Sequence, residues 1–301
     1  MFGLRKTGFG KAASRRRGWL TASAAFLLGC TTISVEERKA FDVKKTVDDA
    51  FFSERGLEKN DFYLRPEPSV RLHGWFIDRP DDEGTVVLFG GNGYLMVTAR
   101  AQLAALSQLP VDIITFDYRG YGASTGNPSV EGLKRDALSV LSYARRDRRV
   151  DDRRVVVHGH SLGSFVALYA AEKRNVAGVV LENPVSNVEA LLDGLVPWYL
   201  RPLVRFDIDP ALKADDNVNR ASHLDRPLLV FSGTEDPVAP DHMAETIYRA
   251  ATPGRARWVS IDGGGHNDLP YAPEFVAAYR EALASMLGAP ATSRGPVRSR
   301  E

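Results

Sequence analysis

The stretch that decides the fold of this chain is Val155-Val156-Val157-His158-Gly159-His160-Ser161-Leu162-Gly163-Ser164. Its valines predict a strand buried on both faces, and an amphipathic helical segment begins directly at Ser161. So abrupt a passage from strand to helix forces the central residue into a strained conformation. The flanking glycines let the two backbones pass closely. The sequence therefore predicts a sharp turn that holds the Ser161 hydroxyl above a sheet, with an inert, glycine-cushioned turn as the alternative.

The alternation of strand and helix continues on both sides of this turn. Short apolar runs rich in β-branched residues predict strands at 70–77, 85–89, 111–116, 154–158, 176–181, 227–231 and 257–261. Longer amphipathic segments predict helices at 98–107, 130–146, 161–174, 242–251 and 273–287. This order indicates an α/β fold with a mostly parallel central sheet and helices on both faces. Chemistry is then expected at the carboxyl ends of the strands.

One domain is expected, because no linker-like stretch divides the middle of the chain. We predict that it spans 61–287 and follows a charged lead-in, 30–60, with no fold of its own. The apolar, proline-broken segment 184–225 predicts a short helical lid, whose Trp198, Tyr199, Leu200 and Leu203 would either favour an apolar substrate group or pack only on the body. The final residues, 288–301, are rich in Gly, Pro, Ser and Arg and predict a disordered tail.

The first 29 residues predict an export signal. They contain six Lys or Arg residues and no acid, and the apolar run 19–28 is too short for the roughly 20 residues that span a bilayer. The run ends at Cys30, the only cysteine, in Leu27-Leu28-Gly29-Cys30. This resembles the lipobox of bacterial lipoproteins, although Leu28 is bulkier than the small residue usual there. Arg16-Arg17 also resembles a twin-arginine signal.

The lipobox resemblance implies an exported protein, anchored to a membrane of the cell envelope by a lipid on Cys30. The alternative is a disordered basic tail with a buried cysteine.

Without the first 29 residues the chain carries 33 basic and 38 acidic residues, a net charge of −5. Such a body has no obvious face for nucleic acid. Nothing in the sequence indicates an oligomeric state.

A serine hydroxyl needs a base to take its proton, and His266 is the best-placed histidine. It follows the predicted strand 257–261 through Asp262-Gly263-Gly264-Gly265, a loop with little side-chain bulk to obstruct an imidazole. We expect ordinary structural roles for the histidines that flank the serine or lack a matching loop: His73, His158, His160, His223 and His242.

The base must in turn be oriented by an acid, and Asp236 lies just beyond the predicted strand 227–231. The adjacent Glu235 is expected to face another way, and Asp268 is expected to cap the histidine loop. Glu182, which ends an earlier strand, is the alternative acid. The chain order serine, aspartate, histidine is typical of one class of serine hydrolase.

An oxyanion that develops during acyl transfer needs hydrogen-bond donors. We expect one to be the backbone N–H of Leu162, at the start of the helix. The other is expected in Phe89-Gly90-Gly91-Asn92-Gly93-Tyr94, directly after a buried strand, and is assigned to the Asn92 backbone N–H. A plain strand-to-helix loop is the alternative. No metal or organic cofactor is implied, because the sequence has no phosphate-binding loop and no Cys/His cluster.

Taken together, the motifs resemble those of the α/β-hydrolase superfamily, and within it those of the Bem46-like and the ABHD13- and ABHD17-like serine hydrolases. The similarity covers about 61–287 and rests on five stretches: Phe89 to Gly93, Phe116 to Ser124, Gly159 to Gly163, Ser232 to Asp236, and Gly265-His266. The resemblance implies that the stretch from Asp117 to Ser124 is structural, so that Arg119 is not catalytic.

This sequence departs from the family at one position. The family usually has His-Gly-Asn in the loop after the first buried strand, and here Gly90 stands at the histidine position. That histidine usually steadies the loop, so the resemblance implies a looser oxyanion arrangement with the Asn92 donor retained.

The sequence therefore predicts a serine hydrolase that cleaves a carboxylic ester or thioester of a small molecule or lipid. Ser161 would form an acyl-enzyme, with His266 as general base and then acid and Asp236 orienting it. Two alternatives stay open: a non-catalytic envelope lipoprotein that uses the fold as a binding module, and a peptidase or acyltransferase with the same three residues.

Overall fold

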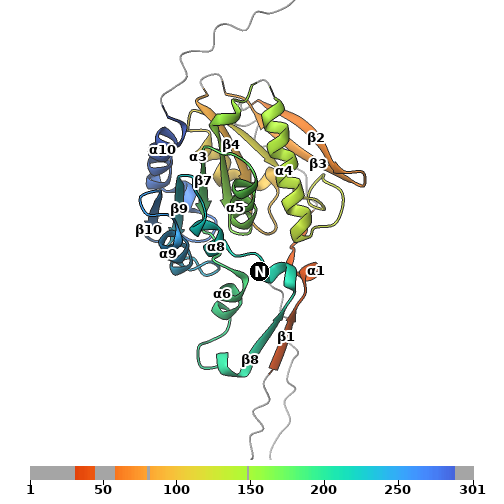
Figure 1. Ribbon diagram of the computed structural model, residues 1–301, viewed down its shortest axis with the longest axis vertical. Coiled ribbons are helices and arrows are strands. Elements are labelled where there is room, and N and C mark those ends of the chain that lie inside the picture. Colours follow the sequence, from red (N-terminus) through yellow and green to blue (C-terminus); the bar gives the residue numbers. More distant parts are fainter. Residues whose placement is uncertain (1–30, 45–57, 80–81, 148, 289–301) are drawn as a thin grey trace, which may run out of the picture.

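The computed structural model describes residues 31–44, 58–79, 82–147 and 149–288 (Figure 1). The strands are β1 (Thr31–Val35), β2 (Lys59–Glu67), β3 (Val70–Ile77), β4 (Gly84–Phe89), β5 (Val111–Phe116), β6 (Val155–His160), β7 (Gly178–Glu182), β8 (Val204–Ile208), β9 (Leu228–Gly233) and β10 (Ala256–Ile261). The helices are α1 (Glu37–Ala40), α3 (Arg100–Leu106), α4 (Val130–Arg146), α5 (Gly163–Lys173), α6 (Val188–Gly194), α7 (Pro210–Lys213), α8 (Asn217–Ser222), α9 (Asp241–Ala250) and α10 (Pro273–Leu287). Short 3₁₀ turns are η1 (Met96–Thr98), η2 (Asp152–Arg154), η3 (Arg201–Leu203) and η4 (Leu269–Tyr271).

Eight strands form the central sheet, in the order β10-β9-β7-β6-β4-β5-β3-β2. The pairs from β10 to β5 are parallel, and the pairs β5–β3 and β3–β2 are antiparallel. Every residue of β4, β5, β6, β7 and β9 is buried, as expected for parallel strands covered on both faces. The predicted α/β architecture with a mostly parallel sheet is confirmed.

The helices lie on both faces of this sheet (Figure 1). The connection from β4 to β5 steps one way along the sheet, and the connections from β5 to β6, β6 to β7 and β9 to β10 step the other way. Because such crossovers are right-handed, α3 lies on one face and α4, α5 and α9 lie on the other. The contacts agree, since α3 packs with α10 while α4, α5, α8 and α9 form a continuous row.

Two segments differ from the sequence prediction. The predicted lead-in contains β1 and α1, and the predicted lid contains the strand β8 beside the helices α6, α7 and α8. The strands β1 and β8 pair in parallel as a separate two-stranded ribbon. Neither is recognisable in the sequence because each strand depends on a partner about 170 residues away along the chain. The strand β2 was also not predicted, since this edge strand is mostly polar and has one buried residue.

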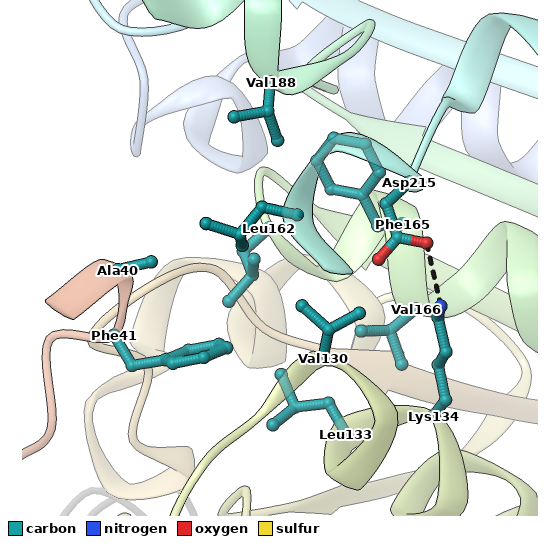
Figure 2. Close-up of a pocket in the computed structure, with 11 residues that line it drawn as sticks. Ala40, Phe41, Val130, Leu133, Lys134, Leu162, Phe165, Val166, Val188 and Asp215 are labelled. Atoms are coloured by element: carbon teal, nitrogen blue, oxygen red, sulfur yellow. Dashed lines mark ion pairs between the residues drawn. The ribbon is translucent and has the colours of Figure 1, made fainter. Parts of the chain in front are cut away.

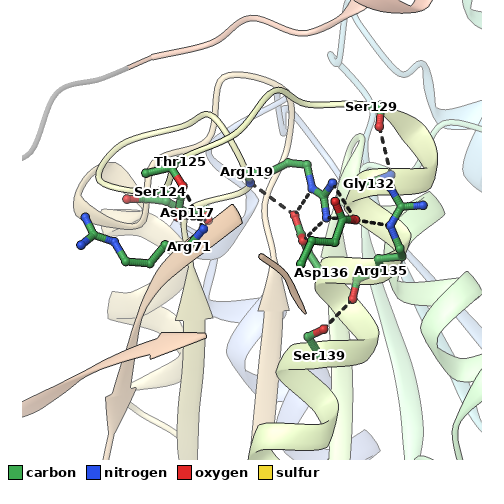
Figure 3. Close-up of polar contacts among 11 residues, drawn as sticks. Arg71, Asp117, Arg119, Ser124, Thr125, Ser129, Gly132, Arg135, Asp136 and Ser139 are labelled. Atoms are coloured by element: carbon green, nitrogen blue, oxygen red, sulfur yellow. Dashed lines mark hydrogen bonds and ion pairs between the residues drawn. The ribbon is translucent and has the colours of Figure 1, made fainter. Parts of the chain in front are cut away.

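The loop after β5 is held by the buried guanidinium of Arg119 (Figure 3). Its Nε donates to Oδ2 of Asp136 at 2.9 Å and its Nη2 donates to Oδ1 at 2.7 Å, while Glu67 accepts at 3.2 Å. Asp136 is completely buried in α4, and Gly132 leaves room there for the Arg119 side chain. Arg119 therefore ties together β2, the loop after β5, and α4.

Replacing Arg119 should destabilise the fold strongly. In Arg119→Met the Asp136 carboxylate stays buried without its cation, so we expect the free energy of unfolding in urea to fall by about 3–5 kcal/mol. Arg153→Met is the matched control, because Arg153 pairs with Asp151 on the surface with 82% of its side chain exposed. Such a pair contributes at most about 1 kcal/mol. Equal losses in the two variants would contradict the role given to Arg119.

Candidate active site

The turn between β6 and α5 has the strained geometry that the sequence predicts. Ser161 has a φ of 51°, in the left-handed region that side chains rarely adopt. A Cβ at Gly159 would lie 2.4 Å from the carbonyl oxygen of Gly163, and one at Gly163 would lie 2.1 Å from that of Phe89. The two glycines are therefore required by close backbone contact, and the turn places Ser161 at the carboxyl edge of the sheet.

Three loops bring Ser161, His266 and Asp236 into one line of hydrogen bonds. His266 Nδ1 lies 2.7 Å from Oδ2 of Asp236, and His266 Nε2 lies 3.0 Å from Oγ of Ser161. An ionised carboxylate only accepts, so Nδ1 carries the imidazole proton and Nε2 is left as an acceptor. The Ser161 hydroxyl therefore donates to His266, the arrangement in which a base can take a proton from a serine.

The Asp236 carboxylate is fixed by its own loop. Its Oδ1 accepts hydrogen bonds from the backbone N–H groups of Val238 at 2.7 Å and Ala239 at 2.9 Å. The side chain is fully buried, whereas the neighbouring Glu235 is exposed. The carboxylate thus presents Oδ2 to the imidazole with little freedom to turn away.

The alternative acid, Glu182, is engaged elsewhere. Its carboxylate is buried at the end of β7, where it accepts from Gln102 at 2.9 Å and lies 3.1 Å from Nε2 of His158. Among the described residues no hydrogen bond joins the Glu182 carboxylate to His266. Glu182 therefore belongs to a buried polar cluster behind the serine turn.

The backbone of the His266 loop is fixed by residues that the sequence reading did not assign to the site. His160 Nε2 donates to the carbonyl oxygen of His266 at 2.8 Å. Asn183, with a φ of 44°, donates from Nδ2 to the carbonyl oxygens of Gly265 and His266 and accepts at Oδ1 from the Gly233 N–H. Asp268 accepts from the Gly265 N–H, as a loop cap should.

His160 and Asn183 each carry a weak signal in the sequence. His160 precedes the serine directly, and Asn183 follows a buried strand at the sheet edge where chemistry is expected. Their partners are the backbone of a loop about 80 or more residues later in the chain. Contacts to a distant backbone leave no pattern of residue types, so the sequence alone could not assign these roles.

The loop after β4 packs against the serine turn. A Cβ at Gly91 would lie 2.9 Å from Nδ1 of His160 and 3.3 Å from Cβ of Ser161. Only a glycine leaves the loop this close. No hydrogen bond from the backbone N–H of Asn92 or of Leu162 is found within the described part of the chain, and both groups belong to the two segments that meet at the serine.

Two tyrosines pack around Gly90, the position at which the resemblance expects a histidine. A Cβ at Gly90 would lie 1.8 Å from the ring of Tyr94, so this ring occupies the space of a side chain at that position. The Tyr94 hydroxyl is hydrogen-bonded to Thr115 Oγ1, and the Tyr118 hydroxyl donates to the Gly90 carbonyl oxygen at 2.9 Å. The backbone at Gly90 is therefore anchored by Tyr118, while the looser oxyanion arrangement that the resemblance implied stays a prediction.

The Asn92 side chain binds the N-terminal strap, which we define as residues 36–44. Its Oδ1 accepts from the Asp42 N–H at 2.8 Å and its Nδ2 donates to the Ala40 carbonyl oxygen at 2.9 Å. Further along the strap, the Lys44 carbonyl oxygen accepts from the Gly122 N–H. The strap thus lies across the loops at the carboxyl edge of the sheet.

An apolar pocket begins beside the serine turn (Figure 2). Leu162, Phe165 and Val166 of the turn and α5 form one wall. The others come from α4, the lid and the strap: Val130, Leu133, Lys134, Val188, Leu212, Asp215, Ala40 and Phe41. Lys134 and Asp215 pair at 3.1 Å, so the only charges in the lining neutralise each other. The cavity volume is about 50 Å³.

The remaining sequence predictions for single residues fall outside this site. His73 is hydrogen-bonded to Asp61, and the exposed His223 contacts Ser222 and Asn219. His242 is exposed on α9. Cys30 lies outside the described residues, as do the predicted signal and most of the predicted tail. No described helix is long and apolar enough to cross a membrane.

The chain is similar in sequence to a known family and to several known proteins. Residues 72–224 match the sequence profile of the alpha/beta hydrolase family. The uncharacterized protein Rv2307c of Mycobacterium tuberculosis is 32% identical over 210 residues, which cover 69% of this chain and 72% of that protein. The lysophosphatidylserine lipase ABHD12 of Mus musculus is 28% identical over 275 residues, covering 78% of this chain and 66% of the relative. The uncharacterized membrane protein YNL320W of Saccharomyces cerevisiae is 28% identical, covering 71% and 75%.

Solved structures share the fold. The esterase Pf2001 of Pyrococcus furiosus superposes with a TM-score of 0.67 at 19% identity, covering 82% of this chain and 97% of the esterase. A thermophilic esterase from Thermogutta terrifontis superposes with a TM-score of 0.56 at 18% identity, covering 77% and 100%.

The buried imidazole of His160 should make the stability of the fold depend on pH. Burial disfavours the imidazolium and, with His266 nearby, holds the pKa of His160 below its usual 6.5, although the Glu182 carboxylate opposes this. A lowered pKa means that the unfolded chain binds the proton more readily. His160 thus contributes stability above about pH 6.5, and this contribution is lost as the pH falls toward the lowered value.

We therefore expect the unfolding free energy of the native protein to decrease as the pH falls below about 6.5. The decrease should be shallower in His160→Gln, which retains a donor for the His266 carbonyl but does not titrate. Urea unfolding of both proteins between about pH 5 and pH 8, a range that brackets the ordinary histidine pKa, measures the difference in slope. Parallel profiles would show that His160 is not a source of the pH dependence.

Proposed function

The chain belongs to the alpha/beta hydrolase family and shares its fold with solved esterases, and from this premise we propose that it is a serine hydrolase. The reaction is the cleavage of a carboxylic ester or thioester through an acyl-enzyme on Ser161. The observation that carries the proposal is the unbroken line of hydrogen bonds from Ser161 through His266 to the buried Asp236.

In the proposed mechanism His266 first acts as a base. Its Nε2 takes the Ser161 proton as Oγ attacks the carbonyl carbon, and the resulting imidazolium is stabilised by the Asp236 carboxylate. His266 then gives this proton to the leaving alcohol or thiol, which leaves the acyl group on Ser161. A water molecule enters, gives its proton to His266 and attacks the acyl carbon. His266 returns the proton to Ser161 as the acid departs.

The oxyanion of each tetrahedral intermediate would be bound by the backbone N–H groups of Leu162 and Asn92. Leu162 lies at the N-terminus of α5, where the helix carries a partial positive charge. Asn92 lies on the loop that touches Ser161 through Gly91. Its side chain is held by Ala40 and Asp42, so the strap fixes the residue whose N–H is needed.

The acyl group would enter the apolar pocket, which begins at Leu162 next to the nucleophile. A cavity of this size holds roughly three to five water-sized groups. We therefore expect short acyl chains to react faster than long ones. We keep the predicted domain limits, 61–287 with a lid at 184–225, as part of the proposal. The body carries the proposed catalytic residues, and the lid supplies Val188, Leu212 and Asp215 to the pocket.

The names of the relatives agree with ester hydrolysis. One relative is a lysophosphatidylserine lipase and one structural neighbour is an esterase. The motifs around Ser161 and Asn92 favour a place in the Bem46-like, ABHD13- and ABHD17-like branch of the family.

We further propose that the protein is an exported lipoprotein with its lipid on Cys30, because a basic and then apolar leader ends there.

The proposed catalytic residues are tested by labelling with a fluorophosphonate, which reacts only with an activated serine. We expect Ser161→Ala to abolish labelling of the purified protein. Asp236→Asn should lower kcat for nitrophenyl esters by roughly 10³–10⁴-fold, because the imidazole loses the partner that fixes its tautomer. In the native protein, the acetate and butyrate esters should be better substrates than the palmitate ester.

Glu182→Gln is the control for the choice of acid, since Glu182 bonds to His158 and Gln102 and does not reach His266. Near-normal turnover in Asp236→Asn, with a large loss in Glu182→Gln, would reverse the assignment. A folded native protein that neither labels nor hydrolyses any ester would instead favour a binding module.

Lipidation is tested separately in the producing cell. The native protein should fractionate with membranes and carry a diacylglycerol group on a new N-terminal cysteine. Cys30→Ser should block both processing and lipid attachment, because the modified thiol is absent. Intact-protein mass spectrometry after detergent extraction measures both changes. Unchanged mass and fractionation in Cys30→Ser would rule out the lipoprotein proposal.

A further inference from the structure

The lid ends in an exposed apolar tip, which we define as residues 195–200. Leu195 is 55% exposed, Trp198 78% and Tyr199 61%, and Leu200 is exposed as well. The rings of Trp198 and Tyr199 contact each other edge to face, with centroids 5.8 Å apart. So many large apolar side chains within six residues are unusual on a protein surface and mark a site of interaction.

Within the described part of the chain, the exposed side chains of the tip lie outside the apolar core and outside the pocket lining. Its four exposed side chains belong to neither of the apolar clusters of the core. The lid residues that line the pocket are Val188, Leu212 and Asp215, and none comes from 195–200. Trp198 and Tyr199, for which the sequence suggested substrate contact or packing on the body, are instead exposed and line neither the described pocket nor the described core.

The described chain begins at this same tip. In the parallel ribbon Thr31 pairs with Val204, which follows Leu200 by one 3₁₀ turn, and Val35 pairs with Ile208 nearer the body. The ribbon extends away from the layered body (Figure 1). The residue that would carry the lipid, Cys30, is bonded directly to Thr31. A chain tethered there by a lipid would bring the tip to the membrane surface.

The composition of the tip suits a lipid surface. Trp and Tyr are enriched where protein meets the headgroups of a bilayer, because each has an apolar ring and a polar hydrogen-bonding group. The exposed Arg201 and Arg205 follow directly and can meet lipid phosphates, with Asp193 and Asp207 as the nearby acids in sequence. A two-stranded ribbon is also marginally stable by itself, so docking of its end would stabilise it.

We infer that the lid tip, Leu195 to Leu200, docks into the surface of a phospholipid bilayer and holds the lid side of the apolar pocket toward it. The inference rests on the proposed function, because α6 leads from the pocket residue Val188 to the tip, and β1 leads from the tip to the pocket residue Phe41. A hydrolase held in this way takes its ester substrate from the membrane surface.

The test uses the full chain and places a reporter in the tip. Cys30 is the only cysteine, so Cys30→Ser removes both the lipid and the native thiol. Tyr199→Cys or Tyr63→Cys is added to this background and labelled with a nitrobenzoxadiazole fluorophore. Tyr63 is the matched control, since it is 57% exposed on the edge strand β2 of the body. Vesicles of phosphatidylethanolamine and phosphatidylglycerol are then added.

The reporter at 199 should become brighter and shift to the blue as it enters the bilayer, while the reporter at 63 should not change. Leu195→Ser with Trp198→Ser should raise the lipid concentration for half-maximal response at 199 by about tenfold or more. Equal responses at the two positions, or no response at 199, would overturn the inference. So would a blue shift at 199 that grows with protein concentration without vesicles, because a second copy of the chain would then cover the tip.

Fluorophosphonate labelling of the same samples separates the two proposals. Vesicle docking should be the same in Ser161→Ala, since the tip contributes no group to the proposed reaction. Normal labelling of the native serine without docking would reject the membrane inference alone. Docking without labelling would reject the proposed hydrolase and leave the tip as a membrane anchor.

Discussion

The close backbone contact between the end of β4 and the turn from β6 to α5 is the constraint on which the site depends. Glycines at 159 and 163 let the helix start against the strand, and at 163 even a Cβ would collide with the Phe89 carbonyl. This contact forces Ser161 into a left-handed conformation and brings the loop with Gly91 against it. The proposed nucleophile and both proposed oxyanion donors are therefore placed by packing of main chain on main chain.

The residues around Ser161 are held in place by hydrogen bonds. The segments after β7, β9 and β10 supply Asn183, Asp236 and His266. Asn183 bonds to backbone groups at the end of β9 and in the loop after β10, Asp236 is held by backbone N–H groups of its own loop, and its carboxylate holds the His266 imidazole. The alignment of the His266 imidazole with the Asp236 carboxylate thus depends on the register of the sheet. A hydrogen-bonded network of this kind would keep the groups of the proposed reaction in one geometry before a substrate binds.

The lid and the strap form a second level of organisation at the same edge. The strap binds Asn92 through Ala40 and Asp42 and supplies Phe41 to the pocket, and it continues into the ribbon that pairs with the lid. One covered wall of the pocket is therefore built from the N-terminal segment. A membrane tether before Thr31 would act on the strap, the lid and the pocket together, since the strap follows β1, the lid contains β8, and residues of both the strap and the lid line the pocket.

The sequence by itself determined the α/β architecture, the strained serine turn and the three residues of the proposed mechanism. These follow from local signals: β-branched runs buried on both faces, glycines where backbones touch, and polar residues just beyond strand ends. Only the tertiary structure decided that Glu182 belongs to His158 and Gln102, that His160 and Asn183 hold the His266 loop, that Tyr94 fills the space at Gly90, and that β1 pairs with β8. Each of these depends on a partner far along the chain, often a backbone group or the volume of a ring, and such partners leave no periodicity or motif in the residues themselves.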